Sequence, residues 1–278
     1  MSADYPSGLY PEARLPTLSP KPTTPSKTHV EEPEPIEGPI LFEESDFRAL
    51  ASPLASNPEY NAHRLAARRR LLALAKRAKA AAEELGLALE CRTSLHHPHA
   101  FNGNRVQRLW AYLTRSKKEK SALKRELGPE LGRDLDSAYR NAYLCFALES
   151  EALEVSLRIH PDGWYDGQNL VNRVKREGLK PWLQQLNQLS GFRLRLHDWN
   201  GEFRCGALTP EQLEEFLKYY TPGNHQLAVE KRYPAKEGAR AGVFEPGCAE
   251  ELLREWLRLV PLFRFTVWSA ESDYLFTK

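Results

Sequence analysis

The sequence predicts an α+β fold, with a mostly antiparallel sheet and helices packed on one face of it. Apolar and charged residues alternate at 153–160 and 192–197, so each strand has one apolar and one charged face. Parallel strands covered on both faces read instead as continuous apolar runs. Helical spacing of apolar residues fills most of the chain between these strands, which favours helices covering the apolar face.

A proline-rich segment precedes this domain. Nine of the twenty prolines lie in the first forty residues, a composition that cannot bury a core. We therefore expect residues 1–45 to be a disordered tail and 46–278 to form a single α+β domain. The segment Pro22-Thr23-Thr24-Pro25 has the PxxP form, which indicates either a docking motif for a protein partner or an extended linker.

The first helix is expected at 58–85, because its apolar residues recur at spacings of three and four. These residues are Ala67, Leu71, Leu74, Ala78, Ala81 and Leu85. Gly86 suits the end of a helix, and 87–93 then has strand character. The next segment is ambiguous, since its apolar spacing fits a helix while its β-branched and aromatic content favours a strand at 109–114. Charged helices follow at 116–127 and 129–140.

Two strands at 143–149 and 153–160 are joined at Ser150 and Glu151, a connection short enough to make them antiparallel neighbours. Thr209, Pro210 and Gln212 form a helix-start signature, with a capping threonine and a proline at the first helical position. The remaining expected helices are 168–177, 181–189, 209–220 and 249–260. The remaining expected strands are 192–199, 226–233 and 262–268.

Composition excludes several classes of protein. The 39 basic and 37 acidic residues nearly cancel, so global attraction to nucleic acid or to an anionic membrane is not indicated. No apolar run is long enough to predict a membrane-spanning helix. The Walker, GxGxxG, GxSxG and HExxH motifs are all absent. The four cysteines form no CxxC pair and no secretory leader is recognised, so we expect reduced thiols and a cytoplasmic protein.

The charged strand face is the leading candidate for a binding site. Its expected members are Glu90, Arg92, Glu154, Arg158, His160, Arg193, Arg195, His197, Glu230 and Arg264. The four arginines 158, 193, 195 and 264 are the expected ligand-binding residues, because guanidinium groups donate forked hydrogen bonds to phosphate or carboxylate. The alternative is a solvated face on which the charges form cross-strand ion pairs.

The loop 160–169 is the second candidate, because a histidine and two carboxylates follow one strand end. Together with Glu154, Asp162 and Asp166 are candidate ligands of Mg²⁺ or Mn²⁺, and His160 is a candidate acid or base. The alternative is ordinary turn chemistry, in which Asp–Gly pairs form turns and Asp166 caps a helix.

Two further groups are weaker candidates. The histidines at 96, 97 and 99 lie near Cys91, yet Pro98 interrupts them and no helical spacing preorganises a metal site. Basic residues on the helices 58–85 and 116–127, Arg64 among them, are candidates for contacts to phosphates of nucleic acid. A solvated helix face is the alternative, because glutamates are interspersed.

Three functions follow from these candidates. The first is a cytoplasmic protein that binds an anionic ligand, nucleic acid included, with His160 and His197 as candidate catalytic or pH-sensitive residues. The second is a metal-assisted hydrolase of phosphodiesters. The third is a non-catalytic interaction module that recruits a protein partner through its proline-rich tail.

Overall fold

A computed structural model describes residues 38–93, 105–133, 135, 140–199, 201–235 and 243–276. These residues belong to one compact unit, which extends from Pro35 to Lys278. Most of the expected tail, including the PxxP segment at Pro22–Pro25, lies outside the described residues.

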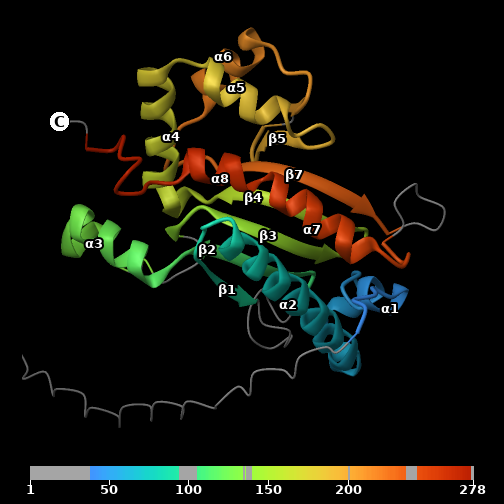
Figure 1. The fold of residues 1–278 in the computed structure, drawn as a ribbon. Helices are drawn as coiled ribbons and strands as arrows, with labels where there is room; N and C mark the ends of the chain where they lie inside the picture. Colours follow the sequence, from blue (N-terminus) through green and yellow to red (C-terminus); the bar gives the residue numbers. More distant parts are fainter. Residues whose placement is uncertain are drawn as a thin grey trace, which may run out of the picture. The chain divides into compact units, whose positions relative to one another are not determined.

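The described strands form one seven-stranded sheet in which every neighbouring pair is antiparallel, so the predicted fold class is confirmed (Figure 1). The order across the sheet is β1-β2-β3-β4-β7-β5-β6. β7 is therefore inserted between β4 and β5, and it brings Glu230 beside Arg158, which lies 72 residues earlier in the chain. The strands are β1 (Leu89–Thr93), β2 (Arg108–Arg115), β3 (Tyr143–Glu149), β4 (Ala152–Ile159), β5 (Arg193–Leu196), β6 (Glu202–Arg204) and β7 (Leu227–Pro234).

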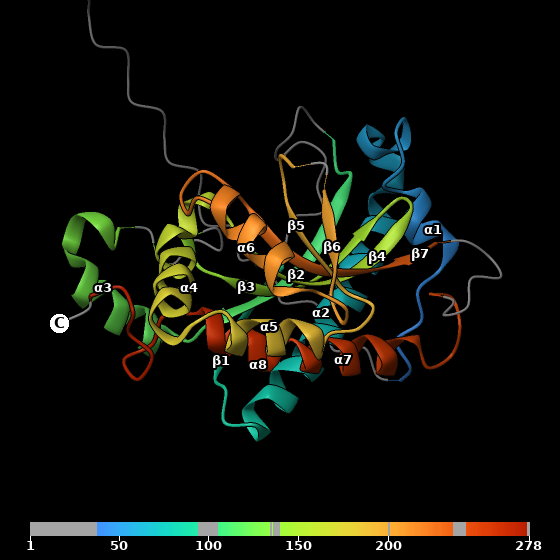
Figure 2. The same cartoon turned by 90° about the horizontal axis from the view of Figure 1, so that it is seen from above.

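The helices α2, α7 and α8 lie on one face of the sheet in both views (Figures 1 and 2). The helices are α1 (Glu44–Arg48), α2 (Asn61–Glu84), α3 (Lys117–Leu131), α4 (Trp164–Glu177), α5 (Lys180–Asn187), α6 (Pro210–Tyr219), α7 (Cys248–Arg258) and α8 (Val260–Thr266). Short 3-10 helices occur at Leu54–Ser56, Pro58–Tyr60 and Pro161–Gly163. Among the helices of the described part, none is long and apolar enough to cross a membrane.

The core lies between this helical layer and the apolar face of the sheet. The alternation in β4 works as the sequence predicts, because Leu153, Val155, Leu157 and Ile159 all belong to the buried cluster. From the helical side, Trp256 of α7 packs with its ring stacked on Phe146 of β3. Glu154, Ser156 and Arg158, which alternate with these apolar residues in β4, therefore lie on the opposite face of the sheet.

The packed part of the chain begins before residue 46, where the sequence places the domain boundary. Ile40 and Phe42 are both 2% exposed and belong to the main core cluster. Arg77 of α2 also donates a hydrogen bond to the carbonyl of Gly38. Residues from at least Ile40 onward are thus part of the domain.

The predicted strand 262–268 is wrong, because the chain forms α8 there. The aromatic content favoured a strand, but Pro261 occupies the first turn of a helix and both Leu262 and Phe263 are buried. Adjacent buried residues fit a helix embedded in a core better than an alternating strand. Arg264 therefore does not lie on the sheet and instead donates a hydrogen bond to the carbonyl of Leu85.

Three smaller differences concern the ends of elements. The predicted helices 116–127 and 129–140 are one element, α3, kinked at Gly128 (φ 78°) and ending at Leu131. The helix predicted at 168–177 begins four residues earlier, at Trp164, so Asp166 lies in its first turn. The three-residue strand β6 is too short to have a periodic pattern, and the sequence did not predict it.

Candidate functional site

The sheet face opposite α2, α7 and α8 carries the charged residues, and we name it the charged face. The strand register places Glu154 of β4 opposite Arg232 of β7, and Arg158 opposite Ala228. On the other side of β7, Arg195 of β5 is also opposite Ala228. Side chains of paired residues share a face. The predicted grouping of Arg158, Arg193 and Arg195 on one face is therefore what the register gives.

Glu154 is the most enclosed carboxylate of this face, with its side chain 2% exposed. Arg158 donates to its Oε1 from Nε (2.9 Å) and from Nη2 (2.8 Å). Arg108 of β2 reaches both carboxylate oxygens from Nη2 at 3.1 Å. The hydroxyl of Ser156 donates to Oε1 at 2.6 Å, and Arg232 approaches Oε2 at 3.5 Å. Three guanidinium groups thus surround one buried carboxylate.

Ion pairs extend from this centre in two directions. Arg158 Nη2 also donates to Glu230 Oε2 (2.6 Å), and Arg195 Nη1 donates to Glu230 Oε1 (3.0 Å). In the other direction, Arg108 and Arg232 both bind Glu149. Most arginines of the charged face are thus held in cross-strand ion pairs, as the alternative interpretation of this face expected.

The protonation states follow from this pairing. Burial by itself raises the pKa of Glu154, but Arg158, Arg108 and the Ser156 hydroxyl outweigh it and lower the pKa to about 2. Burial is the largest single effect and acts to lower the pKa of Arg158, but the attractions of its neighbours, Glu154 first and then Glu230, together outweigh burial and raise the pKa. Glu154 and Arg158 are therefore both charged at neutral pH.

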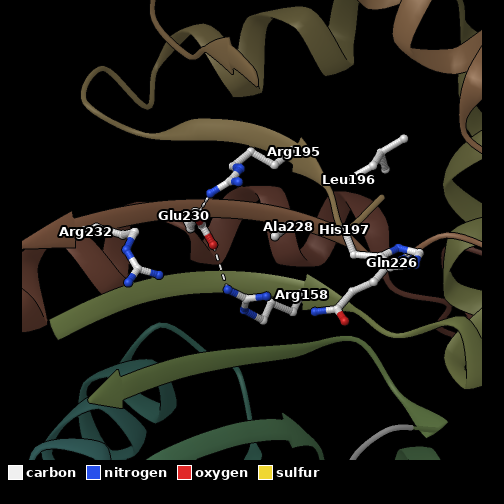
Figure 3. A pocket seen from close by; sticks show the side chains of 8 residues that line it. All are labelled: Arg158, Arg195, Leu196, His197, Gln226, Ala228, Glu230 and Arg232. Carbon is white, nitrogen blue, oxygen red and sulfur yellow. Dashed lines mark hydrogen bonds and ion pairs between the residues drawn. The ribbon is translucent and has the colours of Figure 1, made fainter. Parts of the chain in front are cut away.

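A pocket of about 160 Å³ lies on the charged face where β4, β7 and β5 run side by side (Figure 3). Figure 3 shows the Arg195 and Arg158 guanidinium groups on opposite sides of Glu230. The residues that line the pocket are Arg158, Arg195, Leu196, His197, Gln226, Ala228, Glu230 and Arg232.

Several donors of this pocket have no partner among the described residues. Arg158 uses Nε and Nη2 but not Nη1, and Arg195 uses Nη1 but neither Nε nor Nη2. The side-chain amide of Gln226 likewise bonds to no described residue. Both oxygens of Glu230, by contrast, accept bonds from arginines. The pocket's free hydrogen-bonding capacity is therefore mostly that of donors.

The ring of His197 has a defined orientation. The backbone N–H of Gln226 donates to its Nδ1 at 3.0 Å, so this nitrogen carries no proton and the neutral ring has its N–H at Nε2. Asp198 lies beside it, with Oδ1 3.6 Å from Nδ1. His225 is next in line at a ring distance of 6.3 Å and contacts Asp198 Oδ2 at 3.3 Å. His197 thus offers the pocket a further N–H.

His160, the other candidate catalytic histidine, caps the 3-10 helix that follows β4. Its Nδ1 accepts a hydrogen bond from the backbone N–H of Asp162 at 3.2 Å. Burial lowers its pKa; attraction by Asp162 opposes this effect and repulsion by His197 adds to it. His160 does not line the pocket of Figure 3. Its contact with Asp162 is the turn chemistry that was the alternative to a metal loop.

The structure does not bring the three candidate metal ligands together. Glu154 is enclosed by arginines on the charged face, while Asp162 lies in a turn and is 55% exposed. Asp166 is fully buried in α4. No group of three or more histidine, cysteine, aspartate or glutamate side chains among the described residues could hold a metal ion.

Asp166 instead joins three distant parts of the chain. It forms a buried ion pair with Arg115 at the end of β2. It also accepts hydrogen bonds from the backbone N–H groups of Ala142 (2.7 Å) and Trp268 (2.9 Å). The sequence could not indicate this role, because Arg115 is 51 residues away and Trp268 is 102 residues away.

The other candidates are also placed. Arg193 is on the charged face but is 50% exposed, pairs with Glu202 and does not line the pocket. Arg64 is not a surface cation, because it is fully buried and donates to the carbonyls of Ala49 and Asn57. Glu90 pairs with Lys120 at the β1 edge, three strands from β4. The histidines at 96, 97 and 99 lie outside the described residues.

Arg108, Glu149, Arg232 and Gln226 belong to this site but were not among the residues that the sequence predicted for it. Arg232 lies two residues after Glu230 in β7, so its side chain points to the same face of the sheet. Arg108 likewise shares a face with Trp110, but the predicted strand began at residue 109 and left Arg108 out. Both were therefore accessible from the alternation alone. Gln226 precedes β7, and only the pairing of β7 with β5 places it beside His197.

No protein-family model and no curated protein matches this chain.

We expect Asp166→Asn to destabilise the protein by about 3–5 kcal/mol, because it leaves the buried Arg115 charge without its partner. Asp162→Asn is the matched control: this side chain is 55% exposed, and the free energy of unfolding should change by less than about 0.5 kcal/mol. Urea unfolding of both variants measures the difference. A similar stability for the two variants would contradict the structural role of Asp166.

We expect Glu154 to contribute to the pH dependence of stability. Since its folded-state pKa is lowered from 4.5 to about 2, its stabilising contribution is present above pH 4.5 and is lost as the pH falls towards 2. The loss amounts to roughly 3 kcal/mol. In Glu154→Gln, stability at pH 7 should be lower, and its decline between pH 5 and pH 2 should be smaller by that amount.

Urea unfolding midpoints at several pH values measure this effect. The control is Glu151→Gln, an exposed glutamate of the same hairpin, which should follow the parent protein. An unchanged pH profile in Glu154→Gln would show that the charge network does not act as described.

Proposed function

We propose that this protein binds a small anion in the pocket between β4, β7 and β5. The observation that supports this most strongly is the combination of engaged acceptors and free donors. Both oxygens of Glu230 are occupied, while Arg158 Nη1, Arg195 Nε and Arg195 Nη2 have no partner among the described residues. Guanidinium donors of this kind bind the oxygens of phosphate and carboxylate groups.

The charge and the volume of the pocket also support a small anionic ligand. Three arginines and one glutamate line the pocket. Together with Arg108, Glu149 and Glu154, which pair with them, the network has four arginines and three glutamates and therefore one net positive charge. A volume of about 160 Å³ suits one anionic group rather than a whole drug-sized ligand, for which pockets of roughly 300–1,000 Å³ are usual. The ligand group is therefore a single phosphate or carboxylate.

The pocket is also preorganised. Arg158 is held by Glu154, Ser156 and Glu230, and its side chain is only 13% exposed. Arg195 is fixed at one end by Glu230 while the rest of its guanidinium group, 43% exposed, remains accessible. Arg158 is thus ordered before a ligand binds and Arg195 is held in part, which lowers the entropic cost of binding.

The metal-assisted hydrolase has less support, since Glu154, Asp162 and Asp166 have separate partners. Nucleic acid stays within the proposed ligand class, because each backbone phosphate is an anion of suitable size. The cysteines at 91, 145, 205 and 248 are all free thiols, which fits the cytoplasmic location that we propose. Recruitment of a protein partner by the tail remains a separate proposal, tested by deleting residues 1–37.

We expect Arg195→Ala to weaken binding of inorganic phosphate by at least about tenfold, since a hydrogen bond to a charged group contributes roughly 1.5–3 kcal/mol. Isothermal titration calorimetry at low ionic strength measures the dissociation constant. The control is Arg193→Ala, two residues away on the same strand and face, whose guanidinium pairs with Glu202 outside the pocket. It should bind phosphate as the parent protein does.

Equal loss in both variants would mean that the general charge of the face, not the pocket, attracts the anion. Malonate, titrated in the same way, is the probe for a carboxylate ligand. If the parent protein bound neither phosphate nor malonate, the proposed function would be overturned. A single-stranded oligonucleotide in the same titration tests the larger ligand, and its binding should weaken with added salt and with Arg195→Ala.

A further inference from the structure

We infer that the ligand of this pocket is the terminal phosphate of a phosphomonoester, bound as the fully deprotonated dianion. The inference rests on the proposed function and assigns its ligand class. Its basis is the convergence of free guanidinium donors from two strands on one small pocket, an arrangement that suits a compact group with several acceptor oxygens.

The charges are close together and come from different directions. Arg158 belongs to β4 and Arg195 to β5, the two strands that flank β7. With neighbouring strands about 4.8 Å apart, the two arginines approach from opposite sides of Glu230. A tetrahedral phosphate directs three oxygens outward and can accept from both guanidinium groups at once. A dicarboxylate spreads its two charges over two separate groups and needs more space.

The pocket also disfavours a ligand that carries a proton. Glu230 is the pocket's carboxylate, and both its oxygens already accept hydrogen bonds from Arg158 and Arg195. Among the side chains that line the pocket, the Gln226 amide oxygen accepts no bond from a described residue, whereas a P–OH group at Glu230 would have to share an oxygen that already binds an arginine. His197 donates from Nε2, because its Nδ1 is occupied by the Gln226 backbone N–H. A dianion, which only accepts, uses these donors without loss.

The organic part of the phosphomonoester can extend from the pocket into solvent. Arg195 and Arg232, on the outer side of the pocket, are 43% and 38% exposed. A phosphate group that contacts both of these arginines is open to solvent on its remaining side. The organic part of the ester therefore extends away from the sheet. The site therefore selects the phosphate and tolerates variety in what it is attached to.

The test compares methyl phosphate with inorganic sulfate at pH 5.0 and pH 7.5 by isothermal titration calorimetry. Sulfate remains a dianion throughout and so reports changes in the protein's own groups. The charged and titratable groups that line the pocket are Arg158 from β4, Arg195 from β5, Glu230 and Arg232 from β7, and His197. Beside them lie Glu154, His160, Asp198 and His225. The ratio of the two association constants removes their contribution.

The second pKa of a phosphomonoester is about 6, so its dianion fraction rises roughly tenfold between these two pH values. We expect the ratio of methyl phosphate to sulfate affinity to rise by the same factor. We also expect dimethyl phosphate, a monoanion at every pH, to bind at least about tenfold more weakly than methyl phosphate at pH 7.5. Gln226→Leu removes the free amide oxygen and should leave the pH dependence of the ratio unchanged.

A ratio that stays constant while both anions bind would overturn the dianion assignment and leave the proposed anion-binding function intact. If that ratio depended on pH only in Gln226→Leu, the dianion assignment would also be overturned. Such a result would show that the Gln226 amide oxygen of the parent protein accepts a hydrogen bond from a protonated ligand. Failure of methyl phosphate and sulfate to bind at either pH would overturn this inference. If malonate also failed to bind, the proposed function would be overturned with it.

Discussion

The buried carboxylate of Glu154 is the constraint on which the charged face depends. A lone carboxylate in this position would lose its hydration at a cost of several kcal/mol. Here Arg158, Arg108 and the hydroxyl of Ser156 replace the lost water, and Arg232 completes the enclosure. Four strands must be in register for this to happen, because Arg108 comes from β2, Glu149 from β3, Glu154 from β4 and Arg232 from β7.

The same network positions the pocket. Arg158 divides its donors between Glu154 and Glu230, and Glu230 in turn holds Arg195. Arg158 is thereby fixed by the more deeply buried Glu154, and Arg195 by the more deeply buried Glu230. The proposed binding groups are the outer members of a structure whose inner members stabilise the sheet. This arrangement explains how a face consisting largely of ion pairs can still present free guanidinium donors at one place.

Elements whose sequence pattern is local formed as predicted. Alternation in 153–160 and 192–197 correctly indicated two strands with charged faces, and the short connection at Ser150 correctly indicated a hairpin. The capped start at Thr209 was also correct, with both hydrogen bonds of the capping box present. In each case the residues that determine the element lie within a few positions of one another.

The features that the sequence did not predict depend on contacts between distant parts of the chain. Nothing near Glu230 shows that β7 lies between β4 and β5, so the sequence could not reveal that Arg158 and Arg195 share a carboxylate. Asp166 looked like a loop ligand because its partner Arg115 is on another strand. The aromatic segment around Phe263 forms a helix because of its burial against its neighbours, which overrides its strand propensity.

The most direct test of the account follows the arginine Nε–H signals by ¹H–¹⁵N NMR during titration with inorganic sulfate. The Nε–H of Arg195 has no partner among the described residues and lines the pocket, so its signal should shift progressively and saturate. The signal of Arg193, on the same strand but paired with Glu202, should remain in place. Parallel shifts of both signals, or no shift of either, would contradict an anion site built from the Glu154 and Glu230 network.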